Sequence, residues 1–406
     1  MKFGYYIAKK LSTSKQQTFT TTITRLAIAA VSVSICVVIL SFGILLGFKK
    51  EIREKVTGYA GDIVISQYQL SNGNEQNTFD IDKKLIAKIK NKLNVDAVFP
   101  IIQKAGIVKS DSVLEGLIFK GVPYNYDFSF FEKHLKKGKL PVYADSTDSY
   151  DILLSEYSAQ VLSVDTGSTL NLFFIDDSDV RRRRPKVVGI YNTGLQEFDK
   201  QFAIGDFRML QRIVSTDYKV TSSLEVKVNN FNLVDGTSES INEDLDYKLG
   251  AKTVKEMYPT IFQWLEIVDT NVLVIIILMF IVAIINMFTV LLILIIDRIP
   301  MIGLLKAMGS GTTQILSIFN WQGLFILVGG VLIGNAVALT AAFLQNQFKL
   351  IKLSADTYYM DSVPFYLPWY YLVIINIVAI VICYIFTYLP LKLIAKITPS
   401  DSIRFR

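Results

Sequence analysis

The stretch that decides the fold is LAIAAVSVSICVVILSFGILLGF, which runs from Leu26 to Phe48 without one Asp, Glu, Lys or Arg. An α-helix needs about 20 apolar residues to cross the hydrocarbon core of a bilayer. Three further uncharged stretches of at least this length follow, at Val272–Ile296, Ile315–Leu344 and Pro368–Leu391. The sequence therefore predicts an α-helical membrane protein with four transmembrane helices, one followed by three.

Residues 49–270, between the first and second spans, are predicted to form an α+β domain outside the membrane. Runs such as Asp62–Ser66, Ala97–Val108 and Lys186–Tyr191 indicate strands. Apolar residues at helical spacing indicate a helix over Phe79–Leu93. Strands and helices mixed in this way are typical of an α+β domain. The other candidates are strands at Gly116–Gly121, Ile152–Leu154, Thr169–Phe174 and Leu224–Val228, and helices at Glu156–Leu162 and within Asn230–Leu249.

Positive charge predicts the orientation of the chain. Cytoplasmic segments beside membrane helices are enriched in Lys and Arg. Such residues precede the first span, occur between the second and third as Arg298 and Lys306, and follow the fourth, so both termini are expected in the cytoplasm. The predicted segments are a cytoplasmic amphipathic helix (1–24), membrane helices (25–48, 271–296, 315–345 and 368–391), the external domain (49–270), a cytoplasmic connection (297–314), an external loop (346–367) and a cytoplasmic tail (392–406).

The first two membrane helices are predicted to extend beyond the bilayer as a stalk. Phe48, Ile52 and Val56 continue the helical period after the first span, and Ile261 and Trp264 do so before the second. Two amphipathic extensions on the same side of the membrane can pair and bury their apolar faces. The alternative is that they are interfacial anchors.

The chain shows no catalytic constellation and no cofactor or metal site. Its cysteines, Cys36 and Cys383, both lie in predicted spans, so the external domain must fold without disulfides. His134 is the only histidine, and beside lysines it is expected at the surface. No phosphate-loop motif is present. The run Arg181–Arg184 could bind nucleic acid or lipid phosphate, but aspartates just before it favour a solvated hairpin tip.

The connection between the second and third spans carries a recognisable motif. Pro300 suits the first turn of a helix, and Gly309–Gly311 ends it. The sequence IGLLKAMG, from Ile302 to Gly309, resembles the coupling segment of FtsX/MacB-like ABC permeases, which contacts the ATPase subunit. The chain also resembles the lipoprotein-releasing branch of this family (LolC/LolE type) at four segments: Phe3–Lys10, Gly43–Phe48, Val188–Asp199 and Pro390–Phe405.

This resemblance implies a permease subunit in a bacterial inner membrane, with the external domain in the periplasm. A separate cytoplasmic ABC ATPase dimer, which binds ATP and Mg²⁺, would drive a pair of permeases, either two copies or two homologues. They would take lipoproteins from the outer leaflet of the membrane lipid to a periplasmic carrier. The implied ATPase contacts are Ile302, Gly303, Leu305, Lys306 and Gly309, and the implied lipoprotein cavity is lined by Phe42, Leu46, Phe48, Ile52 and Trp264.

Two related functions stay open at this point. A MacB-like efflux permease usually carries a fused ATPase, and an FtsX-like regulator of a cell-wall hydrolase typically has a smaller external domain. In the lipoprotein-releasing branch, one permease of the pair uses an external hairpin to engage the carrier. The corresponding segment here, Phe174–Lys186, is short and charged, which leaves the partner role of this chain undecided.

Overall fold

The computed structural model describes residues 5–6, 19–68, 77–110, 113–176, 179–215, 219–354 and 358–396. The chain divides into a helical unit (Met1–Lys50, Trp264–Ile351 and Val363–Arg406) and an α+β unit (Glu51–Gln263 and Lys352–Ser362). Most of the predicted cytoplasmic helix at 1–24 lies outside the described residues, and so does the end of the C-terminal motif, 397–405. The first long helix has already begun at Phe19.

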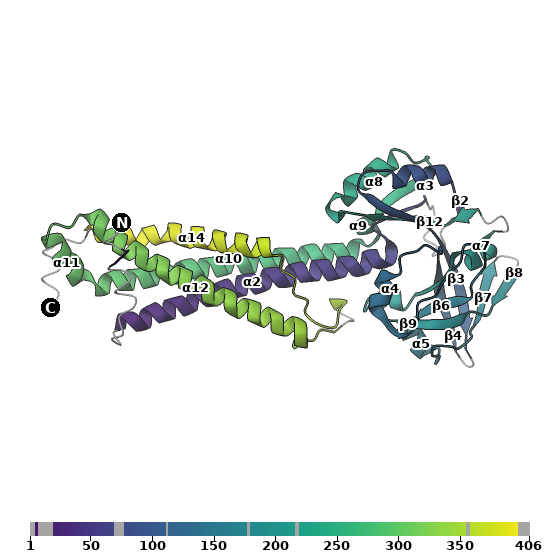
Figure 1. Cartoon of the computed structure of the whole chain (residues 1–406), viewed down its shortest axis with the longest axis horizontal. Helices are drawn as coiled ribbons and strands as arrows, with labels where there is room; N and C mark the ends of the chain where they lie inside the picture. The colour runs from purple at the N-terminus through teal and green to yellow at the C-terminus, as the bar shows by residue number, and fades with distance from the viewer. Residues whose placement is uncertain are drawn as a thin grey trace. The chain divides into compact units, whose positions relative to one another are not determined.

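Four of the described helices are long and apolar enough to cross a membrane, which confirms the predicted apolar helices. Figure 1 shows a short helix, α11 (Ile299–Ala307), between the second and third of them. The first two run well past their apolar stretches, and there the Phe48 ring contacts Trp264, with 6.0 Å between centroids. The four helices are α2 (Phe19–Ala60), α10 (Pro259–Asp297), α12 (Thr312–Phe348) and α14 (Trp369–Lys396).

Helices α2 and α12 approach each other at glycines. A Cβ on Gly330 would lie 2.6 Å from a side-chain carbon of α2, and one on Gly334 would lie 2.7 Å from a backbone oxygen of α2. Helix backbones come this close only where side chains are small. Gly330 and Gly334 therefore form the close crossing of α2 and α12. Gly43 and Gly47, which have the same spacing on α2, pack instead against the segment at Pro364 and Phe365.

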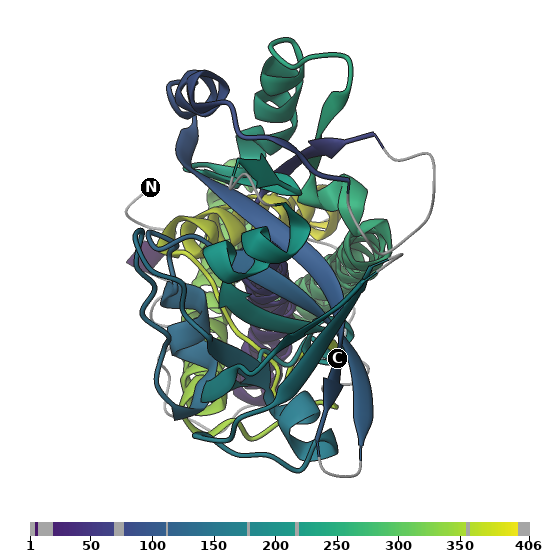
Figure 2. The same ribbon diagram turned by 90° about the vertical axis from the view of Figure 1, so that its right-hand side faces the viewer.

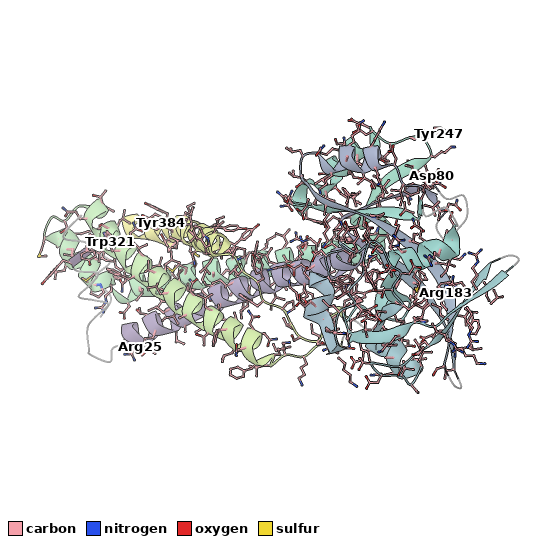
Figure 3. The ribbon with its side chains drawn as sticks, turned by 45° about the vertical axis from the view of Figure 1, so that its right-hand side comes forward. Arg25, Asp80, Arg183, Tyr247, Trp321 and Tyr384 are labelled. Carbon is pink, nitrogen blue, oxygen red and sulfur yellow. The ribbon has the colours of Figure 1, made fainter. Side chains whose placement is uncertain are left out.

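Polar side chains join α12 to α14. Asn335 and Asn376 donate to each other's side-chain oxygens at 2.8 and 2.9 Å, and Asn320 donates to the Tyr384 hydroxyl at 2.9 Å. Figure 3 labels Tyr384 on α14 and Trp321 on α12. Because hydrocarbon offers these groups no other partners, such bonds select one helix pairing.

The α+β unit is built on an 11-stranded sheet in the order β13-β1-β12-β3-β4-β10-β6-β9-β5, with β7 beside β3 and β8 beside β7. Figures 1 and 2 show α3 and α8 together over one end of it. Strands β2 and β11 form a separate pair. The strands are β1 (Ile63–Gln67), β2 (Phe79–Asp80), β3 (Val95–Lys109), β4 (Leu114–Val122), β5 (Leu135–Gly138), β6 (Asp151–Ser155), β7 (Asn171–Asp176), β8 (Asp179–Arg183), β9 (Lys186–Tyr191), β10 (Phe202–Asp206), β11 (Val220–Thr221), β12 (Ser223–Val228) and β13 (Leu249–Thr253). The helices are α3 (Lys83–Lys90), α4 (Ser129–His134), α5 (Glu156–Val161), α6 (Gln196–Asp199), α7 (Phe207–Val214), η1 (Phe231–Leu233), α8 (Val234–Asn242) and α9 (Val254–Met257).

Strand β3 belongs to both halves of this sheet. Its first half pairs with β12 and its second half with β4. One apolar core includes Ile63 and Leu224 and is completed by α3 and α8, whereas the other includes Phe119 and Leu210 of α7. The two cores are therefore joined by one continuous strand.

Two predictions within this unit were wrong in detail. Phe79–Leu93 was expected to be one helix, but Phe79 and Asp80 form β2, and α3 begins only after Asp82, whose side chain accepts from the Lys84 amide at 2.8 Å. β2 pairs with β11, far away in sequence, so local periodicity could not reveal it. The arginine run was expected at a hairpin tip, but Arg181–Arg183 pair with β7 as part of β8.

Candidate functional site

The helix that connects α10 to α12 buries part of the predicted ATPase contact. Ile302 is fully buried in a cluster with Ile295, Ile315 and Phe319, and Gly303 is buried beside it. Leu305 and Lys306 are half-buried, and Gly309 is exposed. The side chains of Leu304 and Met308 are exposed by 62% and 67%. The large apolar side chains that α11 and its C-terminal end expose are therefore Leu304 and Met308, which are not among the five predicted ATPase contacts.

The predicted cavity residues also differ in how deeply they are buried. Phe48 and Ile52 are buried within the chain, so they do not line an open cavity here. Phe42, Leu46 and Trp264 are half-buried. A helix that is apolar on every side gives no periodic signal of which face is covered. The five residues therefore do not form one continuous exposed surface in this chain.

Lys120 on β4 is fully buried at the end of α2. Its Nζ lies 2.6 Å from Glu225 Oε1 on β12 and donates to the Tyr59 carbonyl oxygen in the last turn of α2. Burial lowers the pKa of Lys120 and raises the pKa of Glu225, while their mutual attraction opposes both shifts. Loss of one partner from a buried ion pair costs about 3–5 kcal/mol. The end of α2 is thus fixed to the sheet by a charged group.

The Val188–Asp199 motif forms a turn closed by its last residue. The Asp199 carboxylate accepts from the Thr193 hydroxyl at 2.8 Å, and from the amides of Thr193 and Gly194 at 3.1 and 3.2 Å. Burial raises the pKa of Asp199 to about 6, and these hydrogen bonds act against that rise. Gly194 has φ of +74°, a conformation that glycine adopts without strain.

Lys55 on α2 reaches this turn and the loop between α12 and α14. Its side chain, only 6% exposed, donates to the Tyr359 carbonyl oxygen at 2.9 Å. A Cβ on Gly194 would lie 3.0 Å from Lys55 Nζ, so the glycine leaves room for the ammonium. Glu51 lies 3.9 Å from the same ammonium. Nothing in the sequence around Lys55 predicts its burial, because that burial depends on partners far away in the chain.

The arginines of β8 have structural partners. Arg181 donates to the carbonyl oxygens of Arg212 and Ile213 at 3.2 and 2.7 Å, at the end of α7. Positive charge at a helix C-terminus is stabilising. Arg182 donates to Asn171 at 2.5 Å, and Arg183, labelled in Figure 3, lies on the same edge strand. This arrangement gives Arg181 and Arg182 a structural role at the β7–β8 hairpin.

The described part of the chain holds no cluster of three or more His, Cys, Asp or Glu side chains suited to a metal ion. Cys36 and Cys383 are free thiols on α2 and α14. His134 was expected at the surface but is half-buried, with Nδ1 2.8 Å from the Phe130 carbonyl oxygen. Burial lowers the pKa of His134. The polar contacts described above therefore connect secondary-structure elements to one another.

Comparison with known families agrees with this architecture. Residues 24–244 match the family described as the MacB-like periplasmic core domain, which is more than half of the chain. Residues 273–399 match the FtsX-like permease C-terminal family. The chain belongs to the FtsX/MacB-like permeases. In this permease the first match runs from α2 to α8, and the second includes α11, α12 and α14.

Individual relatives of this permease align along nearly its whole length. The lipoprotein-releasing system transmembrane protein LolC of Xylella fastidiosa is 21% identical, with 97% of each chain covered. The corresponding LolE protein of Haemophilus influenzae is 18% identical, with 99% of each chain covered. The solved periplasmic region of MacB from Actinobacillus actinomycetemcomitans matches with 13% identity and a TM-score of 0.36, over 51% of this chain and 95% of that one.

Proposed function

We propose that this permease is the non-catalytic transmembrane subunit of an ATP-driven transporter that releases lipoproteins from the outer leaflet of the inner membrane. The observation that carries the proposal is the alignment with LolC over 97% of both chains. An efflux permease with a fused ATPase, or a regulator with a smaller external domain, is not expected to share this layout from end to end.

The energy would come from a separate cytoplasmic ATPase dimer, which would hold ATP and Mg²⁺. Extraction of acyl chains from a bilayer costs about 0.8 kcal/mol per CH₂, so release needs an energy source and an apolar shelter. The exposed Leu304 and Met308 of α11 would contact the ATPase, with Lys306 and Gly309 beside them. Ile302 and Gly303 would hold α11 against its own bundle, because they are buried there.

The external end of the transporter would hand the lipoprotein to a soluble periplasmic carrier. In lipoprotein-releasing permeases one member of the pair engages the carrier with a hairpin, and the segment that corresponds to it by resemblance, Phe174–Lys186, overlaps the β7–β8 hairpin here. Both termini would lie in the cytoplasm, as the basic flanks of the spans indicate. A second permease, either another copy or a homologue, would complete the pair.

Depletion of this protein tests the proposal. After depletion, the inner and outer membranes are separated and outer-membrane lipoproteins are quantified in each. We expect these lipoproteins to accumulate in the inner membrane and to return to the outer membrane when the wild-type chain is supplied again. Normal sorting with altered drug sensitivity would support an efflux permease instead, and normal sorting with a division or wall defect would support a regulator.

A further inference from the structure

The loop between α12 and α14 belongs to the α+β unit, although both flanking helices belong to the helical unit. Residues Lys352–Ser362 cluster with Glu51–Gln263. The base of the loop is closed by an antiparallel bridge between Lys352 and Ser362 and by a hydrogen bond from the Leu353 amide to the Asp361 carbonyl oxygen at 3.0 Å. The chain therefore enters and leaves this unit through two hydrogen-bonded segments, 351–353 and 361–363, which together are called the neck.

One side chain of α12 forms hydrogen bonds with both segments of this neck. Gln345 donates to the carbonyl oxygens of Ile351 and Val363 at 3.2 and 3.0 Å, and it accepts from the Ile351 amide at 3.0 Å. It is only 9% exposed. Gln345 thus binds both strands of the neck, where α12 ends and the segment toward α14 begins.

Lys55 holds the far end of the same loop. Its ammonium donates to the carbonyl oxygen of Tyr359, which has φ of +60°, a conformation that a residue with a side chain adopts only when its surroundings enforce it. The carboxylates of Asp199 and Asp361 also attract this ammonium. The contact therefore joins three segments: α2, the Val188–Asp199 motif and the loop.

We propose that Lys55 and Gln345 are positioning residues that fasten the two ends of the 352–362 loop, so that the loop transmits movement of α12 and α14 to the external domain. This path passes through the loop and rejoins α2 at Lys55, in addition to the direct connection along the continuous helices α2 and α10. The inference rests on the proposed function, because transmission matters only in a transporter driven by ATP.

The test uses the permease co-purified with its ATPase and placed in proteoliposomes with a bound lipoprotein and a soluble carrier. Lys55→Met removes the donor and Gln345→Leu removes the neck contacts, while Lys133→Met replaces an exposed lysine of α4 as a matched control. Three quantities are measured: amide hydrogen exchange at residues 358–362, the ATPase rate, and lipoprotein released per ATP hydrolysed.

We expect Lys55→Met to speed exchange at 358–362 by about tenfold or more, as for a lost buried hydrogen bond to a charged group. Release per ATP should fall several-fold, with the ATPase rate within about twofold of wild type. Gln345→Leu should give the same uncoupling, and the double variant should be no worse than either single variant, since both act on one path. Lys133→Met should behave as wild type.

Three results would overturn the inference. Unchanged exchange at 358–362 in Lys55→Met would show that Lys55 does not hold the loop. Faster exchange with unchanged release per ATP would show that the loop transmits nothing, and a multiplicative loss in the double variant would show two separate effects. Unchanged exchange in β3 is the check that the domain has folded. A wild-type complex that releases no lipoprotein would refute the proposed function, whereas the exchange comparison still decides the Lys55 contact.

Discussion

Glu115 is a half-buried carboxyl placed against an apolar core. It lies on β4 opposite Val108 of β3, a fully buried residue of the larger core. Among the described residues its Oε2 has no hydrogen-bond partner. Burial raises the pKa of Glu115 to about 7. The folded state therefore favours the protonated form of this side chain more than the unfolded chain does.

The sign of the resulting pH dependence follows from this shift. A carboxyl whose folded pKa is raised contributes stability that is complete below its unfolded pKa and is lost as pH rises through the folded pKa near 7. We expect Glu115→Gln to match wild type at pH 5 and to be more stable at pH 8, by about 1 kcal/mol because the half-buried carboxyl is partly screened. Thermal unfolding of the full chain in detergent measures this.

The control for Glu115 is Glu239→Gln, at an exposed position of α8. It should leave the difference between pH 5 and pH 8 as in wild type. Parallel stability profiles for wild type and Glu115→Gln across this range would show that burial of the carboxyl has no such effect.

At this scale the sequence predicted the types of residue better than their partners. The motif that ends at Asp199 was recognised by resemblance, but its hydrogen bonds to Thr193 and Gly194 appear only in the folded turn. Nothing near Lys120 in the sequence predicted that it is buried in an ion pair, because its partner Glu225 lies on a strand about a hundred residues further along the chain. Long-range pairing decides which charges are buried.

Among the elements, the α2–α12 crossing leaves little room for a larger side chain at Gly334. A Cβ on Gly334 would lie 2.7 Å from the Ser32 carbonyl oxygen, and backbone cannot move aside as a side chain can. A Cβ on the nearby Gly329 would lie 3.7 Å from Ile28, at an ordinary contact distance. The two glycines of one helix therefore differ in what they tolerate.

We expect Gly334→Ala to destabilise the chain by about 1–3 kcal/mol, as overpacking does, because α2 and α12 must separate. Gly329→Ala should be neutral or slightly stabilising, since alanine favours a helix over glycine. Thermal unfolding in detergent compares the two variants directly. Equal melting temperatures for Gly329→Ala and Gly334→Ala would contradict the close crossing.

The sequence predicted elements well where the pattern was long or strongly alternating. The four apolar helices and strands such as β3 and β9 were found in this way. Strand β8 was missed because a run of arginines has no β character, and only its pairing with β7 makes it a strand. Helix α7 was also missed, although Asp206 caps its first turn and was a readable signal.

For the whole molecule, the proposed function requires a surface through which a separate ATPase would act on the membrane helices. The exposed Leu304 on α11 is the strongest candidate for the ATPase contact, because its apolar side chain is 62% exposed beside a buried Ile302. Apolar anchors at the centre of an interface carry much of its binding energy. Leu350, just after α12, is exposed to a similar degree, by 67%, and lies outside the proposed contact.

We expect Leu304→Asp to reduce co-purification of the ATPase by about tenfold or more, as loss of an interface anchor does. Leu350→Asp, the same substitution at a comparable exposure, should leave it unchanged. Membrane insertion of both variants is verified by fractionation. Full recovery of ATPase with Leu304→Asp would place the contact elsewhere on the chain.

The pairing of β1 has a consequence for the order in which the external domain is made. β1 lies directly after α2, yet its neighbours are β12 and β13, so Ile63 meets Val226 and Thr253. The strands and helices from β4 to α7 are contiguous in sequence and hold most of the larger core. During synthesis, this middle part can close as soon as it emerges, whereas β1 can complete its pairing only after the chain has been made as far as Thr253.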